Sequence, residues 1–383
     1  LSGTTSVHKA EDTRSSHAHV RNIDRADDAH GLGYGDSAFR ECVFPFTSSC
    51  DDQPDYNQNL DIPERAFVAH VAEGIDESSR SEFDDFSANA RLGSKTSIIH
   101  CVACTGEQLS EMKSTNTKLI WSPQSNIGLY GQTTDVATAL RMKMTVALGP
   151  DWTPSGTMNM LTEAKCAKQV SDEYWNGAIS EKQLVQMMTS NAAKSLGVFD
   201  QIGSIEPGKL ADILMLSGDR RNPYAAVVEA NTTDVRAVFI DAALQMGDQD
   251  VYNSDIARNE FCEVISMCET EKMICVKDIE GEPNRFDRAD WARFGFYDVV
   301  NYVETLVQNQ KPAGLAPDLE YAYVAHPLFE CIPSFDCALG NDTISGERVS
   351  NDLDGDAVPN LSDNCPETFN PGQSNIDGDD NGD

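Results

Sequence analysis

The run AFVAHVAE (residues 66–73) sets the fold of this chain, because it begins as a short apolar strand and ends in two polar side chains, His70 and Glu73. Three later runs have the same form. Short apolar runs rich in branched residues are typical of strands that are buried on both faces. The runs begin roughly 20 to 30 residues apart, enough for one strand and one helix each, so we predict parallel strands joined by helices. The later runs are TSIIH (96–100), TKLIWSP (117–123) and MTVALGPD (144–151).

Polar, charged stretches between these runs are predicted to form outer helices, and weaker strand candidates precede them. Together these runs give seven parallel strands, which predict an α/β fold, a (β/α)8 TIM-type barrel lacking its first strand. The chain begins at Leu1 without a methionine or a signal peptide, and it stops inside a repeat pattern, so it is expected to be truncated at both ends. The helices are expected at 77–93, 105–116 and 133–143, and the weaker strands at 3–7, 19–24 and 42–46.

Changes in sequence pattern predict four segments. The barrel is expected to close with a helix over 181–197, whose Gly197 suits a helix end. The runs at 203–216 and 234–241 predict strands with Pro-Gly turns, hence a small β-sandwich subdomain. The predicted segments are the barrel (1–197), the β subdomain (198–248), a cysteine-rich extension (249–340) and an acidic calcium-repeat tail (341–383).

Composition excludes several classes of partner. The net charge is −33 and the chain has only 29 Lys and Arg residues, which argues against binding to nucleic acid or to anionic membrane surfaces. No run of about 18 apolar residues is present, so no transmembrane helix is expected. Eleven cysteines favour an oxidising location, with the protein secreted, periplasmic or at the cell surface.

Four polar side chains follow the predicted strands, and together they indicate a metal site. The carboxyl ends of parallel barrel strands meet at one mouth, so His70, Glu73, His100 and Asp151 are expected to converge there. Two imidazoles and two carboxylates at one place are suited to a metal that activates water. Two structural alternatives remain open: His100 could be a core histidine, and Asp151 could cap the helix that follows it.

The segment TSNAAKSLGVFDQIGSIEPGKLADILML (189–216), with HVAE, SPQSN and ALGPDWTPSG before it, resembles the amidohydrolase superfamily. The resemblance is to the branch of cytosine, guanine and triazine deaminases or hydrolases. It implies that His70 and Asp151 bind one divalent transition metal, zinc or iron. It also implies that Glu73 shuttles protons, that His100 orients water or a substrate carbonyl, and that Asp151 accepts a proton. Ser125 and Asn126 could bind substrate, although turn formation also accounts for Asn126.

The implied function is that of a metal-dependent hydrolase of non-peptide carbon–nitrogen bonds, acting on a small amide or amino-heterocycle. No lysine lies between Lys9 and Lys95, which excludes a lysine-bridged metal pair. The family's first-strand His-x-His pair would precede this chain, while His17 and His19 have the wrong spacing. The chain alone is therefore expected to hold metal poorly and to be inactive. A homo-oligomer is compatible with the sequence.

The tail from Asn351 resembles the thrombospondin type 3 repeat, in which alternating aspartates bind calcium around a glycine turn. A disordered acidic linker is the structural alternative. By match to the repeat, the calcium ligands are Asp352, Asp354, Asp356 and Asp363 in one unit, and Asn375, Asp377, Asp379 and Asp383 in another.

Two other functions are compatible with the sequence. One is a non-catalytic, secreted calcium-binding surface or matrix protein with a relic barrel. The other is a redox protein that uses its many cysteines. Among them, Cys101 and Cys104 form a CxxC motif beside His100, a pattern that can indicate redox chemistry or zinc binding. Without a thioredoxin-like pattern, buried thiols or a local disulfide are favoured for this pair.

Overall fold

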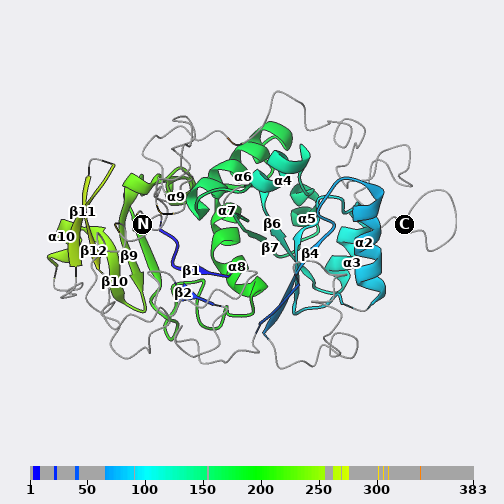
Figure 1. Cartoon of the computed structure of the whole chain (residues 1–383), viewed down its shortest axis with the longest axis horizontal. Helices are drawn as coiled ribbons and strands as arrows, with labels where there is room; N and C mark the ends of the chain where they lie inside the picture. Colours follow the sequence, from blue (N-terminus) through cyan, green and yellow to red (C-terminus); the bar gives the residue numbers. More distant parts are fainter. Residues whose placement is uncertain are drawn as a thin grey trace.

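The computed structural model describes most of the chain between residues 65 and 254 and shorter segments on either side (Figure 1). Most of the predicted cysteine-rich extension and the whole calcium tail lie outside the described residues. The described ranges are 3–8, 21–23, 39–42, 65–89, 91–152, 155–254, 262–268 and 270–275, with single residues at 301, 305, 309 and 337.

A five-stranded parallel sheet forms the centre of the molecule, and its strands follow one another in chain order. The four strongest strand predictions are confirmed, because every one of those runs contains a strand. The weaker strand predicted at 42–46 is displaced to 39–42. The strands are β3 (Phe39–Cys42), β4 (Ala66–Val71), β5 (Thr96–His100), β6 (Lys118–Trp121) and β7 (Val146–Leu148).

Helices follow the strands, as predicted, and bury apolar faces against the sheet. Asp76 caps the first of them through the Ser79 N–H, and Thr105 caps the second in a capping box. Phe83 and Phe86 from the first helix are fully buried. The helices are α2 (Glu77–Ala88), α3 (Gly106–Ser114), α4 (Pro123–Tyr130), α5 (Val136–Arg141), α6 (Met160–Tyr174), α7 (Glu181–Met188) and α8 (Ser190–Ser195).

The helix predicted over 181–197 is two helices that meet at Thr189. Its predicted end is confirmed, because α8 ends at Ser195, Leu196 is its C-cap, and Gly197 follows with a φ of +65°. A Cβ at this position would lie 2.4 Å from the carbonyl oxygen of Arg65. Glycine thus ends the helix and lets the chain pass close to the start of β4.

The first two strands lie apart from the central sheet. β1 (Ser6–Val7) and β2 (Arg21–Asn22) pair in parallel as a two-stranded sheet. The seven predicted strands are therefore all present and the paired ones are parallel, but in the described residues they form two sheets rather than one continuous ring. The shared α/β architecture is confirmed, while closure of a barrel stays a prediction.

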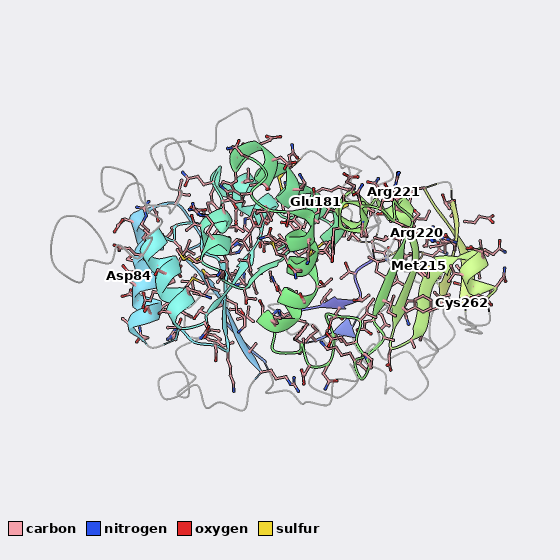
Figure 2. The ribbon with its side chains drawn as sticks, turned by 180° about the vertical axis from the view of Figure 1, so that it is seen from behind. Asp84, Glu181, Met215, Arg220, Arg221 and Cys262 are labelled. Atoms are coloured by element: carbon pink, nitrogen blue, oxygen red, sulfur yellow. A yellow bond between two sulfur atoms is a disulfide. The ribbon has the colours of Figure 1, made fainter. Side chains whose placement is uncertain are left out.

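A separate antiparallel sheet lies at the other end of the molecule. Figure 2 shows Met215 and Cys262 on this sheet, far along the long axis from Asp84 on α2. In the described residues the predicted β-sandwich is one sheet, and two of its strands come from the segment assigned to the extension. Its order is β11 (Cys262–Met267), β12 (Thr270–Cys275), β10 (Ala243–Asp248), β9 (Val235–Ile240) and β8 (Ile213–Leu216). The short helices α9 (Pro223–Val228) and α10 (Gln249–Tyr252) and the 3-10 turn η3 (Thr232–Asp234) accompany it.

Seven of the cysteines in the described part of the chain are disulfide-bonded. Three of the bridges join Cys101 to Cys104, Cys166 to Cys337, and Cys262 to Cys275. The local disulfide favoured for the CxxC motif is therefore confirmed. Among the described helices, none has both the length and the apolar character needed to cross a membrane.

Candidate functional site

The predicted polar residues lie at the carboxyl edge of the parallel sheet. His70 is the penultimate residue of β4, and Glu73 follows the strand by two positions. His100 is the last residue of β5, where it pairs in register with Val71 of β4. Asp151 follows β7 by three residues. Since these strands belong to one parallel sheet, their ends bring all four side chains to one edge.

The four side chains are close enough to act together. One ligand atom from each of His70, His100 and Asp151 lies within 4.8 Å of the others. The His100 Nε2 atom lies 3.5 Å from a carboxylate oxygen of Glu73 and 4.0 Å from one of Asp151. The two imidazole rings lie 5.1 Å apart, centroid to centroid. The structure thus brings together the residues that the sequence analysis expected on one rim.

The backbone at this edge adopts a conformation that side-chain-bearing residues rarely use. Ala72, His100, Cys101 and Asp151 have φ values of 56°, 70°, 56° and 64°. Each such residue costs about 1 kcal/mol or more and persists only where surrounding contacts hold it. Here the Cys101 N–H donates to the carbonyl of Val71, and the Cys101–Cys104 disulfide closes the turn. The strained turns direct the polar side chains across the end of the sheet.

His100 is the buried centre of the site, with a side chain only 1% exposed. Burial lowers the pKa of His100, and the negative charges of Glu73 and Asp151 offset part of this effect. The Asn126 amide lies 2.9 Å from Nδ1 of His100. The Thr134 hydroxyl donates to the His100 carbonyl oxygen. His100 is therefore held at both its ring and its backbone.

Glu73 has a partner that the sequence analysis missed. The Tyr130 hydroxyl, at the end of α4, donates to Glu73 at 3.0 Å. Burial, followed by the charge of Glu73, raises the pKa of Tyr130 to about 12, so the phenol stays protonated and can donate. The Glu73 side chain remains 28% exposed, and its second oxygen lies 3.5 Å from Nε2 of His100. The position of Tyr130 within a short helix after SPQSN was too weak a signal to identify it.

The two residues predicted to bind substrate, Ser125 and Asn126, form hydrogen bonds with residues of the site itself. Both are fully buried in α4. The Ser125 hydroxyl donates to Asp151 at 2.5 Å, and Asn126 contacts His100. The alternative in which Asp151 caps the next helix is wrong, because α6 begins at Met160 and Asn159 caps it.

Glu163 is a second residue that the sequence analysis missed. It is completely buried, and its carboxyl group accepts the Thr157 hydroxyl at 2.6 Å and the Gln124 N–H at 3.3 Å. Burial raises the pKa of Glu163 to about 8, and the charge of Asp151 adds to the shift. Its signal in the sequence was a carboxylate on the apolar stripe of a helix, in register with Ala167 and Val170.

The donor set fits a divalent transition metal. His70 can offer an imidazole nitrogen and Asp151 a carboxylate oxygen, the two ligand types found in catalytic zinc sites. His100 can add a second nitrogen if its Nε2 atom carries no proton. Among the described residues, no Lys or Arg forms an ion pair with Glu73 or Asp151. The site thus has negative charge that a cation would balance. The eight predicted calcium ligands lie outside the described residues.

Comparisons with known proteins show which families this chain resembles. Residues 64–245 match the model of the amidohydrolase family, and residues 349–373 match that of the thrombospondin type 3 repeat. A 5-methylthioadenosine/S-adenosylhomocysteine deaminase of Clostridium tetani is 26% identical over 219 residues, which are 53% of this chain and 51% of that protein. A 5'-deoxyadenosine deaminase of Methanothermobacter thermautotrophicus is 30% identical over 167 residues, 41% of this chain and 39% of the relative.

Among solved structures, an adenosine deaminase from Xanthomonas campestris with bound zinc is similar at 18% identity and a TM-score of 0.44. The match covers 59% of this chain and 65% of that one. The chain spans about half or less of the length of the curated relatives named above. The chain contains an amidohydrolase family domain, followed near its carboxyl end by a thrombospondin type 3 repeat.

Proposed function

We propose that this domain is part of a metal-dependent aminohydrolase that removes an amino group from a small heterocycle, with adenosine-type nucleosides as the first class to test. The observation that carries the proposal is the cluster of His70, His100 and Asp151 ligand atoms within 4.8 Å, with Glu73 3.5 Å from His100. The substrate class is supported by the names of the relatives, which are deaminases of adenosine derivatives.

His70 and Asp151 are the residues that would hold the metal, with zinc the best match to a nitrogen and an oxygen donor. A zinc ion bound there would lower the pKa of a water molecule to about 7. Asp151 would bind the metal and would also accept a proton from that water, while the Ser125 hydroxyl donates a hydrogen bond to one of its two oxygens. Ser125 thereby fixes the orientation of the carboxylate.

Glu73 and His100 would act on the substrate. In the overall reaction, water adds to the ring carbon that bears the amino group, the carbon–nitrogen bond breaks, and ammonia leaves while the ring gains a carbonyl oxygen. Glu73 can carry a proton to the leaving nitrogen, since one of its oxygens is held by Tyr130 and the other faces His100. His100 can donate from Nε2 to the oxygen that becomes the carbonyl.

We include in the same proposal the barrel architecture, calcium binding by the tail, the location of the protein and the role of its cysteines. The seven parallel strands support a (β/α)8 barrel that lacks its first strand. The repeat match at 349–373 supports calcium binding by the tail, and the disulfides support a location outside the reducing cytoplasm. The disulfide bonding of seven cysteines in the described part of the chain favours a structural role for these residues over a redox function.

The test is release of ammonia from adenosine-type substrates by the intact parent protein loaded with zinc. Glu73→Gln is expected to lower kcat by about 10²- to 10⁴-fold, the usual contribution of a general acid or base. Glu77→Gln is the matched control, because Glu77 is exposed on α2 and its ion-pair partner among the described residues is Arg80. Unchanged turnover in the Glu73 variant, or no ammonia from any aminated heterocycle, would contradict the proposal.

A further inference from the structure

We infer that Trp121 fixes the position of the proton on His100, acting through Thr133 and Asn126. These three positioning residues form a chain of hydrogen bonds that ends on the Nδ1 atom of His100. In this arrangement the proton of the neutral imidazole is on Nε2, the atom that faces Glu73 and Asp151. The catalytic role of that proton, as the donor to the substrate oxygen, rests on the proposed function. Its location on Nε2 does not depend on that function.

The direction of the chain is set at Trp121. The side chain is fully buried at the end of β6, and its indole N–H can donate a hydrogen bond but cannot accept one. Its partner is the Thr133 hydroxyl oxygen at 2.7 Å. In the described part of the chain, Thr133 has one other hydrogen-bond partner, the Asn126 amide oxygen at 3.4 Å. The Thr133 hydroxyl therefore accepts from Trp121 and donates to Asn126.

Asn126 passes this direction on to His100. With its amide oxygen accepting from Thr133, its NH₂ group points at Nδ1 of His100, 2.9 Å away. An NH₂ group only donates, so Nδ1 must be the unprotonated acceptor. The other ring nitrogen, Nε2, then carries the proton.

The reversed network is less favourable at both ends. With the Asn126 amide turned over, its NH₂ group would donate to Thr133, and the hydroxyl proton of Thr133 would have no acceptor among the described residues. Nε2 would also present a lone pair to the carboxylates of Glu73 and Asp151, at 3.5 and 4.0 Å. A lone pair on Nε2 would repel the negatively charged carboxylate oxygens, whereas an N–H group at Nε2 is attracted to them.

The consequence is a division of labour within the cluster. An Nε2 atom that carries a proton donates a hydrogen bond and cannot bind a metal, so His70 and Asp151 are the ligands and His100 is the donor. The family resemblance seen in the sequence implies the same roles for these three residues. The hydrogen-bond chain adds a physical reason why His100 is not a metal ligand in this molecule.

The experiment is ¹⁵N NMR of the full chain with labelled histidine, without metal or substrate. His100 is assigned by the signals lost in His100→Gln. The wild-type spectrum is expected to show an unprotonated Nδ1 and a protonated Nε2. Asn126→Asp, whose ionised carboxylate only accepts, should protonate Nδ1. Thr133→Val should give a mixture of the two tautomers, and Trp121→Phe should shift the ratio in the same direction.

Thr134→Val is the matched control, because its hydroxyl bonds the backbone of His100 rather than the ring. It should leave the tautomer as in wild type. A wild-type Nδ1 that is protonated would overturn the inference without any variant. So would a Thr133→Val spectrum identical to wild type, or an equal change in Thr134→Val. Because no turnover is measured, failure of this inference and failure of the proposed deaminase activity are separate outcomes.

Discussion

Charged side chains occur in both the antiparallel sheet and the parallel sheet of this protein. In the antiparallel sheet they form ion pairs with opposite charges, whereas at the carboxyl edge of the parallel sheet the carboxylates lack a Lys or Arg partner among the described residues. In the antiparallel sheet, the Lys272 side chain is 2% exposed and pairs with Asp248. It also donates to the Val235 carbonyl at 2.9 Å. Arg236 reaches the other oxygen of Asp248 at 2.8 Å. Lys272 and Arg236 thus each lie against an opposite charge that the same sheet supplies.

At the carboxyl edge of the parallel sheet, Glu73, Asp151 and Glu163 gather around one another with no Lys or Arg ion pair among the described residues. Their polar partners are neutral: a tyrosine, a serine, a threonine and a buried imidazole. Such an arrangement is costly unless a proton or a cation is supplied. The comparison teaches that charge matched within the fold stabilises structure, whereas unmatched negative charge marks a site for chemistry.

The largest expected effect is that of Asp151→Asn in the intact parent. Loss of a ligand and proton acceptor should lower kcat by about 10³-fold or more, while stability without metal stays the same or rises because one unbalanced charge is gone. Ammonia release gives the first quantity and urea unfolding of the metal-free protein the second. Retained turnover would remove Asp151 from the mechanism.

Glu163→Gln tests whether the third carboxylate holds a proton rather than a charge. Below its ordinary value of 4.5, Glu163 is protonated in both the folded and the unfolded chain. Between 4.5 and about 8 only the unfolded chain ionises, so the free energy of unfolding falls as pH rises, by about 1.4 kcal/mol per unit at most. The variant should lose this fall between pH 5 and 8.

Urea unfolding at several pH values measures the dependence on Glu163, and Glu173→Gln on the exposed face of the same helix is the control. The Gln amide oxygen can still accept from the Gln124 N–H. Its NH₂ group can donate to the Thr157 oxygen if the Thr157 hydroxyl, which now donates to Glu163, donates only to the Asn159 carbonyl oxygen. Equal slopes in wild type and the Glu163 variant would show that this carboxyl is ionised in the folded protein.

Lys272→Met tests how much the buried ion pair of the antiparallel sheet stabilises the protein. Asp248 would lose one partner but keep Arg236, so we expect a loss of about 2 kcal/mol in the free energy of unfolding, less than for a fully orphaned buried charge. Zinc affinity should not change. Lys182→Met, exposed on α7, is the control. A fall in the zinc affinity of the Lys272 variant would contradict the conclusion that this ion pair stabilises structure and has no part in metal binding.

The smallest effect is expected in the tail, a third region of unmatched charge with nine acidic residues and no Lys or Arg from Asn351 onward. Asp354→Asn should weaken calcium binding about tenfold, equivalent to about 1.4 kcal/mol, by removing one charged ligand. Calorimetric titration measures this change, with Asp342→Asn outside the matched repeat as control. Absence of calcium binding in the wild type would favour an acidic linker.

The sequence alone determined the strands of the parallel sheet and the polar residues at their ends. This was possible because a strand buried on both faces must be apolar along its length, so that His70, Glu73, His100 and Asp151 stand out where the runs stop. The tail's match to a calcium repeat followed from residue spacing in the same way.

Only the tertiary structure decided which side chains meet. Asn126 reaches His100 across 26 residues, and Tyr130 reaches Glu73 across 57. Such partners depend on how helix α4 packs over the sheet and on side-chain rotamers, which periodicity does not encode. The same reason explains why Glu163 escaped notice and why β1 and β2 form a sheet of their own: hydrogen bonding between distant segments is set by three-dimensional packing.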